Sequence, residues 1–295
     1  MGSALFFGSV FDAAQGVLLM EKDIKKAHGV FEKLWKSQKI NGKTEKLSTT
    51  DKVKWSKADM DEFILTDEDK ALIEKGDVTP QWVSMRRKGH LMLDAYNEQV
   101  VPHLKEVIST QQYVKIENED GDLIRGYTDL IAVWELNEEV ANSIEDEKLR
   151  ESILELKKYN GQVIIFDNKT ASQKYKEDSV KDSRQLGTYV ENPLLDFEVE
   201  LAGYIVVPKK FRKQKLPKIP IQIIIDKVDS DVVEEIFEEY EDSLKGIKLG
   251  DFPCTRECTK TPWGCCYAKY CSSGGEDTTG LVYVGKDNTN GKKSS

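Results

Sequence analysis

The sequence predicts an α/β fold in which a central mixed sheet is flanked by helices. Three observations lead to this prediction. Runs with strand character lie in the middle of the chain, at residues 112–117, 123–132, 162–169, 201–207 and 220–226. Segments with helical periodicity lie before and after them, at residues 4–21, 81–108 and 230–248. The length of 295 residues is enough to bury a substantial core.

The N-terminal third is predicted to be helical. Residues 4–21 predict a buried helix, because their apolar positions extend widely around the helix surface and favour an enclosed position. Residues 22–80 are polar, rich in lysine and interrupted by turn signals, which predicts short helices. Residues 81–108 predict a long amphipathic helix that ends near Pro102 or just beyond it. We therefore assign about residues 22–108 to an inserted helical lobe.

The rest of the chain predicts the sheet and its flanking helices. Asp120-Gly121 is a hairpin turn signal between strands at 112–117 and 123–132. Further helices are expected at 137–158, 179–190 and 230–248, and further strands at 162–169, 201–207 and 220–226. We expect one domain over residues 1–275, with its core at about 109–248, a cysteine-rich segment at 250–271 and a flexible tail at 276–295.

Composition and charge limit the classes of function. No apolar run approaches the roughly 20 residues that cross a bilayer, and the chain does not begin with a charged and then apolar signal segment. We therefore expect a cytoplasmic protein without a membrane partner. A formal net charge of −9 argues against a general polyanion binder. If the protein binds nucleic acid, we expect it to do so through local basic patches that surround an acidic site filled by metal ions.

The strand at residues 162–169 ends in the charged sequence Asp167-Asn168-Lys169. Side chains two apart on a strand point the same way, so Asp167 and Lys169 share a face. A second acid, Asp129, lies at the end of another predicted strand. Two such carboxylates can bind one or two Mg²⁺ or Mn²⁺ ions, with the Asn168 carbonyl as a further ligand. For Asp167-x-Lys169 taken alone, an ordinary polar strand end is the better interpretation, because such a tripeptide is common by chance.

Gln185 and Tyr189 are four residues apart on a predicted helix, so they share one face. An amide and a phenol on one face can bind a phosphate or hold the side chain of Lys169. The alternative is an amphipathic surface helix, which is the better interpretation without the strand motif.

Three segments in order carry a family resemblance: residues 126–129 (Gly-Tyr-Thr-Asp), 165–170 (Ile-Phe-Asp-Asn-Lys-Thr) and 185–189 (Gln-Leu-Gly-Thr-Tyr). They resemble the successive motifs of the PD-(D/E)XK nuclease superfamily, in its RecB-type branch, which includes CRISPR-associated and phage recombination exonucleases. The resemblance extends over about residues 4–271. It implies a restriction-endonuclease-like core and a metal-dependent DNA exonuclease that acts on DNA ends or single strands in recombination or repair, of phage or mobile-element origin.

The resemblance also implies roles for individual residues. Asp129 and Asp167 would bind the metal, Lys169 would activate the attacking water, and Gln185 and Tyr189 would orient the substrate. The family's first motif carries a metal-binding histidine, where this chain has Asp12.

Asp12 is a competent ligand for Mg²⁺ or Mn²⁺. His90 is the other candidate for the histidine position, but a lone helical histidine is more often an ordinary surface or packing residue. Asp129 and Asp167 are 38 residues apart, longer than is usual in the family, with the acidic segment 137–158 inserted between them.

Five cysteines lie within eighteen positions near the C-terminal end: Cys254, Cys258, Cys265, Cys266 and Cys271. This density predicts a structural four-thiolate site for Zn²⁺ or a [4Fe–4S] cluster. The resemblance favours Cys258, Cys265 and Cys271 as a cluster-binding trio, with Cys266 as an alternative to Cys265. Either Cys254 completes the set, or the cluster is incomplete, or zinc is bound.

A basic run between two predicted strands is the main candidate for contact with DNA phosphates: Lys209, Lys210, Arg212, Lys213 and Lys215. A second candidate is the run Arg86-Arg87-Lys88. Either run is as well explained by a charged surface turn. Trp82 and Trp263 can stack on bases, but a core position is the better interpretation for a lone tryptophan.

Three alternatives stay open at this point. One is a structure-selective endonuclease of the same fold, and another is a catalytically decayed DNA-binding or scaffold module. The third is a zinc-type binding domain on an unrelated α/β body. DNA is the expected partner, together with a recombination or replication protein, and a bacterial host cytoplasm is the expected location for a phage-encoded protein.

Overall fold

The computed structural model describes residues 3–35, 37–40, 43–46, 53–76, 78–117, 121, 123–195, 198–211 and 219–249. By packing, the chain divides into two units, Met1–Ile236 and Phe237–Ser295. The five cysteines, Trp263, Arg212, Lys213 and Lys215 all lie outside the described residues. The expected C-terminal metal site is therefore still a prediction.

The α-helices are α1 (Ser3–Glu21), α2 (Ile24–Trp35), α3 (Asp67–Glu74), α4 (Pro80–Gln99), α5 (Glu138–Asn142), α6 (Glu147–Leu154), α7 (Arg184–Val190) and α8 (Ser230–Leu249). The strands are β1 (Ser37–Ile40), β2 (Lys43–Lys46), β3 (Leu104–Glu117), β4 (Leu123–Trp134), β5 (Val163–Ala171), β6 (Leu201–Pro208) and β7 (Gln222–Lys227). Short 3₁₀ helices occupy Lys57–Asp59, Glu62–Ile64, Val101–His103, Glu155–Tyr159 and Glu177–Val180. None of the described helices has both the length and the apolar character needed to cross a membrane.

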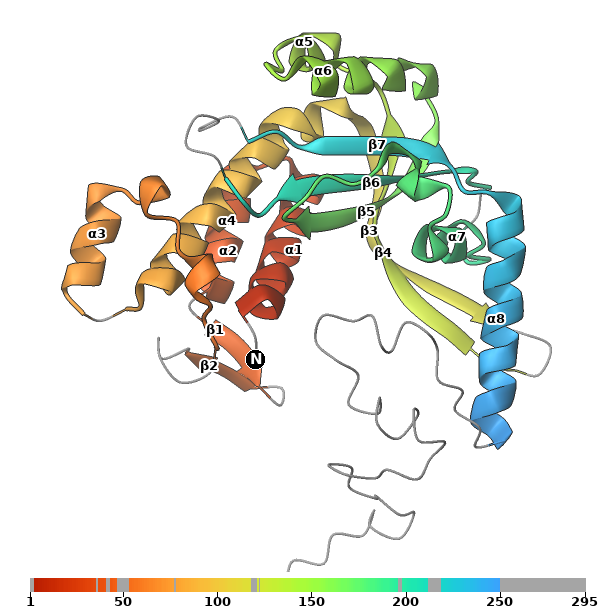
Figure 1. Cartoon of the computed structure of the whole chain (residues 1–295), viewed down its shortest axis with the longest axis horizontal. Helices are drawn as coiled ribbons and strands as arrows, with labels where there is room; N and C mark the ends of the chain where they lie inside the picture. Colours follow the sequence, from red (N-terminus) through yellow and green to blue (C-terminus); the bar gives the residue numbers. More distant parts are fainter. Residues whose placement is uncertain are drawn as a thin grey trace, which may run out of the picture. The chain divides into compact units, whose positions relative to one another are not determined.

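The first unit is built on a five-stranded mixed sheet in the order β3-β4-β5-β6-β7. Only β5 and β6 are parallel, and the other neighbours are antiparallel. One face of the sheet packs against α1 and α4, and the other against α7 (Figure 1). The predicted α/β class, with a mixed sheet flanked by helices, is confirmed.

An aromatic cluster holds α1 and α2 together. Phe7 packs edge-on against Phe31, with ring centroids 6.4 Å apart, and Phe6 lies 4.8 Å from Trp35. The expectation that α1 is enclosed on all sides is wrong, because Leu5 is 70% exposed and Met20 is 58% exposed. Apolar composition alone does not separate a buried helix from one that lines an open groove.

The segment 104–108 is the start of β3 and not the end of a helix, as the sequence pattern predicted. Helix α4 ends at Gln99, and Pro102 lies in the 3₁₀ turn that follows, where its missing N–H costs nothing. The new strand then pairs with β4 from Leu104, which lies opposite Trp134. Long-range pairing has overridden the helical periodicity of this stretch.

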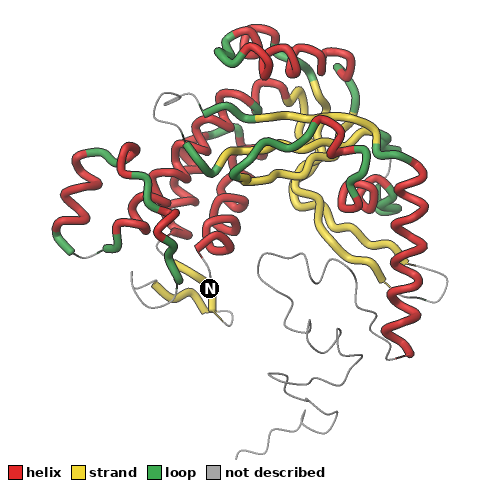
Figure 2. Tube along the Cα trace, in the orientation of Figure 1, coloured by secondary structure: helices red, strands yellow, loops and turns green. Residues whose placement is uncertain are grey.

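Strands β3 and β4 continue beyond the body of the sheet. Strand β4 pairs with β5 only from Leu130 to Val133, whereas its pairing with β3 extends to Leu123. The outer part of the hairpin is therefore a two-stranded ribbon, visible as two long yellow strands in Figure 2. The candidate site lies where this ribbon leaves the sheet.

Candidate active site

Asp129 and Asp167 lie at the point where β4 separates from β5. The last pair between these strands is Leu130 opposite Phe166, and the two acids follow it. The backbone N–H of Asn168 donates a 2.7 Å hydrogen bond to Oδ2 of Asp129, which bridges the gap between the strands. The prediction that the strand of Asp167 ends at its charged residues is wrong. Strand β5 continues to Ala171, because it pairs with β6 as far as that residue.

Lys169 and Asp167 point the same way, as the strand periodicity predicted. Nζ of Lys169 lies 2.6 Å from Oδ2 of Asp167. Asp167 is only 2% exposed, so the ammonium group provides most of the charge compensation available to it among the described residues. A buried acid and a half-buried amine in contact form a compact polar centre on an apolar strand.

Gln185 connects this pair to α7. Its Nε2 group donates to Oδ1 of Asp167 and to the hydroxyl of Tyr189, each at 2.8 Å. Its Oε1 atom accepts a 2.8 Å hydrogen bond from Nζ of Lys169. The shared face of Gln185 and Tyr189 is confirmed. The helix is shorter than predicted, because the Ser183 side chain caps its first turn by accepting from the backbone N–H of Leu186.

The carboxylates repel one another in a partly buried setting. Burial, followed by the charge of Asp167, raises the pKa of Asp129 to about 7. The same two causes raise the pKa of Asp12 to about 6. Burial also raises the pKa of Asp167, even though Lys169 lowers it. Groups in this state favour a nearby cation, which relieves both the burial cost and the repulsion.

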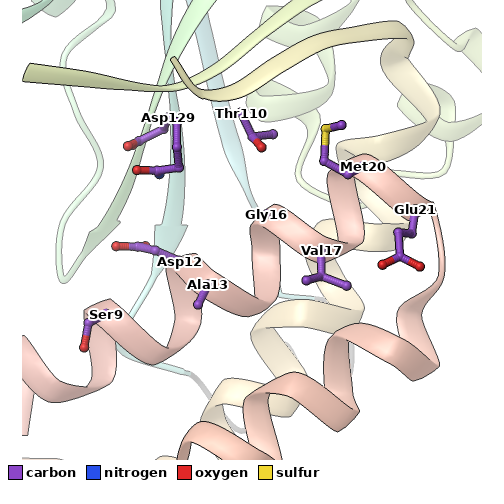
Figure 3. Close-up of a pocket in the computed structure, with 10 residues that line it drawn as sticks. Ser9, Asp12, Ala13, Gly16, Val17, Met20, Glu21, Thr110 and Asp129 are labelled. Carbon is purple, nitrogen blue, oxygen red and sulfur yellow. The ribbon is translucent and has the colours of Figure 1, made fainter. Parts of the chain in front are cut away.

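Asp12, on α1, lies close to the acids of β4 and β5. It lines a groove of about 620 Å³ together with Asp129 (Figure 3). The other lining residues are Ser9, Ala13, Gly16, Val17, Met20, Glu21, Thr110 and Gln111. Figure 3 shows Asp12 on the helix and Asp129 on the strand, on facing sides of the groove. The structure therefore brings Asp12 and Asp129 to the same groove, and a role for Asp12 as a metal ligand stays a prediction.

The donor chemistry suits a hard divalent cation. Asp12, Asp129 and Asp167 offer carboxylate oxygens, and Mg²⁺ and Mn²⁺ prefer oxygen ligands. Among the described residues, however, no three His, Cys, Asp or Glu side chains are arranged around a common metal position. A Mg²⁺ or Mn²⁺ ion held by these three acids and the Asn168 carbonyl therefore stays a prediction, which rests on the chemistry and mutual repulsion of the carboxylates.

Tyr96 is a member of the site that sequence reasoning missed. This fully buried tyrosine of α4 donates a 3.0 Å hydrogen bond from its hydroxyl to Oδ1 of Asn168. The bond fixes the residue between Asp167 and Lys169. The only sequence signal is a tyrosine on the apolar face of the predicted 81–108 helix, which does not distinguish it from a packing residue.

The basic candidates separate into two groups. Lys209 follows β6, and although burial lowers its pKa, the charge of Asp12 acts in the opposite direction, which places Lys209 near the acidic groove. Lys210 is exposed. In contrast, Arg86 is paired with Glu32 at 2.6 Å, and Lys88 is 4% exposed and lies 2.6 Å from Asp61. Two of the three residues of the second basic run are therefore engaged with acids of the lobe, which makes this run the weaker candidate for phosphate contact.

The remaining predicted residues lie in the helical lobe. Trp82 is 7% exposed, which confirms its core position. His90 lies 2.6 Å from Oε1 of Glu32 and packs edge-on against Phe31, so it is a packing residue of the lobe.

No protein-family model matches the chain, and no curated protein matches it.

Proposed function

We propose that this protein is a metal-dependent deoxyribonuclease with a PD-(D/E)XK core, and that it acts on DNA ends or single strands. The observation that carries the proposal is the network in which Gln185 holds Asp167 and Lys169 beside Asp129. An acid, an amine and an amide in one bonded set suit phosphodiester hydrolysis, because that reaction needs a positioned water and a charge-stabilised phosphate.

The chain's own groups have separate tasks in this proposal. Lys169, held by Asp167 and Gln185, donates hydrogen bonds to the attacking water and to the negative charge that develops on the phosphate. Tyr189 and Gln185 keep the ammonium group in place. A bound Mg²⁺ or Mn²⁺ ion would supply an acidified water and neutralise charge on the scissile phosphate. Lys209, near Asp12, is placed to attract a phosphate into the groove.

The proposal is tested by digesting labelled DNA. Single-stranded, duplex and circular substrates, labelled at either end, are incubated with Mg²⁺ and with Mn²⁺. The wild type should degrade linear DNA, and Lys169→Ala should be inactive. Lys70→Ala is a matched control, because Lys70 is an exposed lysine paired with Asp67 on α3. The nuclease proposal fails if the wild type and Lys169→Ala degrade nothing, or degrade DNA equally.

The circular substrate separates exonuclease from endonuclease action. An enzyme that needs an end leaves the circle intact, whereas an endonuclease of the same fold opens it. A decayed scaffold module is the remaining alternative, and the complete set of Asp129, Asp167 and Lys169 argues against it.

The cysteine-rich segment is proposed to be a structural site for a [4Fe–4S] cluster or Zn²⁺. Visible absorbance of the purified protein distinguishes the two, because an iron–sulfur cluster is coloured and Zn²⁺ is not. Cys258→Ser should reduce the content of whichever metal is bound. A role in recombination or repair, with a recombination or replication protein as partner, belongs to the same proposal.

A further inference from the structure

The outer part of the β3–β4 ribbon carries two tyrosines side by side. Tyr113 lies directly opposite Tyr127, and their ring centroids are 5.2 Å apart with an interplanar angle of 48°. The pair Lys115 and Arg125 follows two residues further along the ribbon. Because strand side chains alternate, these four residues share one face. We call them the tyrosine face.

The tyrosine face points away from α7. The intervening pair, Val114 opposite Gly126, lies on the other side of the ribbon. Val114 is fully buried in the cluster that contains Tyr189, and a Cβ atom at Gly126 would lie 3.6 Å from Cε1 of Tyr189. That side of the ribbon is therefore packed, whereas on the tyrosine face Tyr127 is 55% exposed.

The tyrosine face begins next to the acidic groove. Gln111 and Asp129 both line the groove. Gln111 lies two residues before Tyr113 in β3, and Asp129 lies two residues after Tyr127 in β4. Two residues of a strand span roughly 7 Å. A polymer that enters the groove and continues along the ribbon therefore meets the tyrosines next and the two cations after them.

Charge also distinguishes the two surfaces. The described residues that line the groove include the acids Asp12, Glu21 and Asp129 but neither lysine nor arginine. Polyanion phosphates outside the metal site therefore need cations elsewhere. Arg125 is exposed, and Lys115 is half-buried and paired with Glu117 at 2.9 Å, so Arg125 is the stronger of the two.

We propose that the tyrosine face binds single-stranded DNA. An unpaired base stacks on Tyr127, whose ring is supported by Tyr113, and Arg125 binds an adjacent phosphate. Stacking requires a base that is out of the duplex, so this surface selects single strands or frayed ends. This inference rests on the proposed function for its meaning, but the binding is measurable without cleavage.

The test measures affinity by fluorescence anisotropy of a labelled single strand and of the matching duplex, in EDTA so that no cleavage occurs. Tyr127→Ala should weaken single-strand binding about 5- to 100-fold, because stacking on one aromatic is worth that much. It should change duplex binding much less. Tyr127→Phe keeps the ring and should bind within about twofold of the wild type.

Two further variants test the cation and the fold. Arg125→Ala should reduce the slope of the logarithm of the binding constant against the logarithm of the salt concentration by about one, which corresponds to the loss of one phosphate contact. Tyr127→Trp should keep its affinity, and its fluorescence should be quenched when a single strand is added but not when the duplex is added. Phe63→Ala is the matched control, since Phe63 is another partly exposed aromatic, 38% exposed, in a 3₁₀ helix of the lobe.

The outcomes separate this inference from the nuclease proposal. The inference is overturned if the wild type does not bind single strands, if Tyr127→Ala binds like the wild type, or if single strand and duplex lose affinity equally. A wild type that binds through Tyr127 but cleaves nothing removes the nuclease proposal and leaves the inference standing.

Discussion

Gln185 donates a 2.8 Å hydrogen bond from its side-chain amide to Oδ1 of Asp167. The same amide accepts a hydrogen bond from Lys169 through its oxygen, so its two ends match an acid and an amine. Only an amide in one orientation satisfies both partners. A glutamine one turn away from Tyr189 therefore fixes the relative position of the two charged groups.

Removing this amide should slow the chemical step more than it weakens substrate binding. Gln185→Ala is expected to lower kcat about 10- to 100-fold with little change in KM, because the supporting residues of a metal site typically contribute that much. Gln185→Glu should be at least as damaging, since it places a carboxylate beside Asp167. Steady-state kinetics with linear DNA measure the effect. Glu191→Gln, an exposed change at the end of α7, is the control; equal kcat in all variants would remove Gln185 from the mechanism.

Asp129→Asn should make the metal-free protein more stable while abolishing activity. The variant keeps an oxygen that accepts from the N–H of Asn168 but removes one of the converging negative charges. We expect a gain of about 1–2 kcal/mol in the free energy of unfolding in EDTA at pH 8, because active-site residues often contribute to activity at the expense of stability. Mg²⁺ should then raise the melting temperature of the wild type more than that of the variant. Equal shifts in both proteins would argue against a metal at Asp129.

Local spacing explains what the sequence could predict. The common direction of Asp167 and Lys169 follows from the two-residue period of a strand, and that of Gln185 and Tyr189 from the four-residue spacing of a helix. Both depend only on neighbouring residues, so both hold in the structure. The assignment of these residues to nuclease chemistry stays a prediction.

Long-range pairing explains what the sequence could not predict. The charges of β5 lie inside the strand because β6 pairs with it in parallel as far as Ala171, and no local pattern marks that partner. The bond from Tyr96 to Asn168 joins residues 72 positions apart. Such features follow from the tertiary fold and not from the periodicity of one segment.

His103 should make the stability of the protein sensitive to acid. It is fully buried, and burial lowers its pKa to about 4, against about 6.5 in an unfolded chain. Its Nδ1 atom accepts a 2.9 Å hydrogen bond from the backbone N–H of Asn137, which protonation would remove. Unfolding therefore takes up a proton between these two pKa values. The stabilisation is present above about pH 6.5 and is lost as the pH falls toward 4, by about 3 kcal/mol in total.

Urea denaturation between pH 4 and pH 7.5 measures this effect. Carboxylates also titrate in this range, so the comparison is with His103→Asn, whose Oδ1 atom can accept the same hydrogen bond but does not titrate. On acidification the free energy of unfolding should fall less in the variant than in the wild type, even if the variant is less stable at every pH. Parallel pH profiles would show that His103 is not the titrating group.

Two glycines in facing helices should respond in opposite ways to alanine. A Cβ atom at Gly89 of α4 would lie 2.1 Å from Cζ of Phe31, so Gly89→Ala should cost about 1–3 kcal/mol in the free energy of unfolding. At Gly29 of α2 a Cβ atom meets nothing within 4 Å, and Gly29→Ala should gain about 0.5–1 kcal/mol through helix propensity.

Thermal or chemical denaturation of both single variants measures these changes, and a double-mutant cycle with Phe31→Leu assigns the cause. Shortening the ring should recover part of the loss at Gly89, because the clash is with the far end of that side chain. It should leave the gain at Gly29 unchanged. A loss at Gly89 that is the same with phenylalanine and leucine at position 31 would mean that α2 and α4 do not pack as closely as the structure has them.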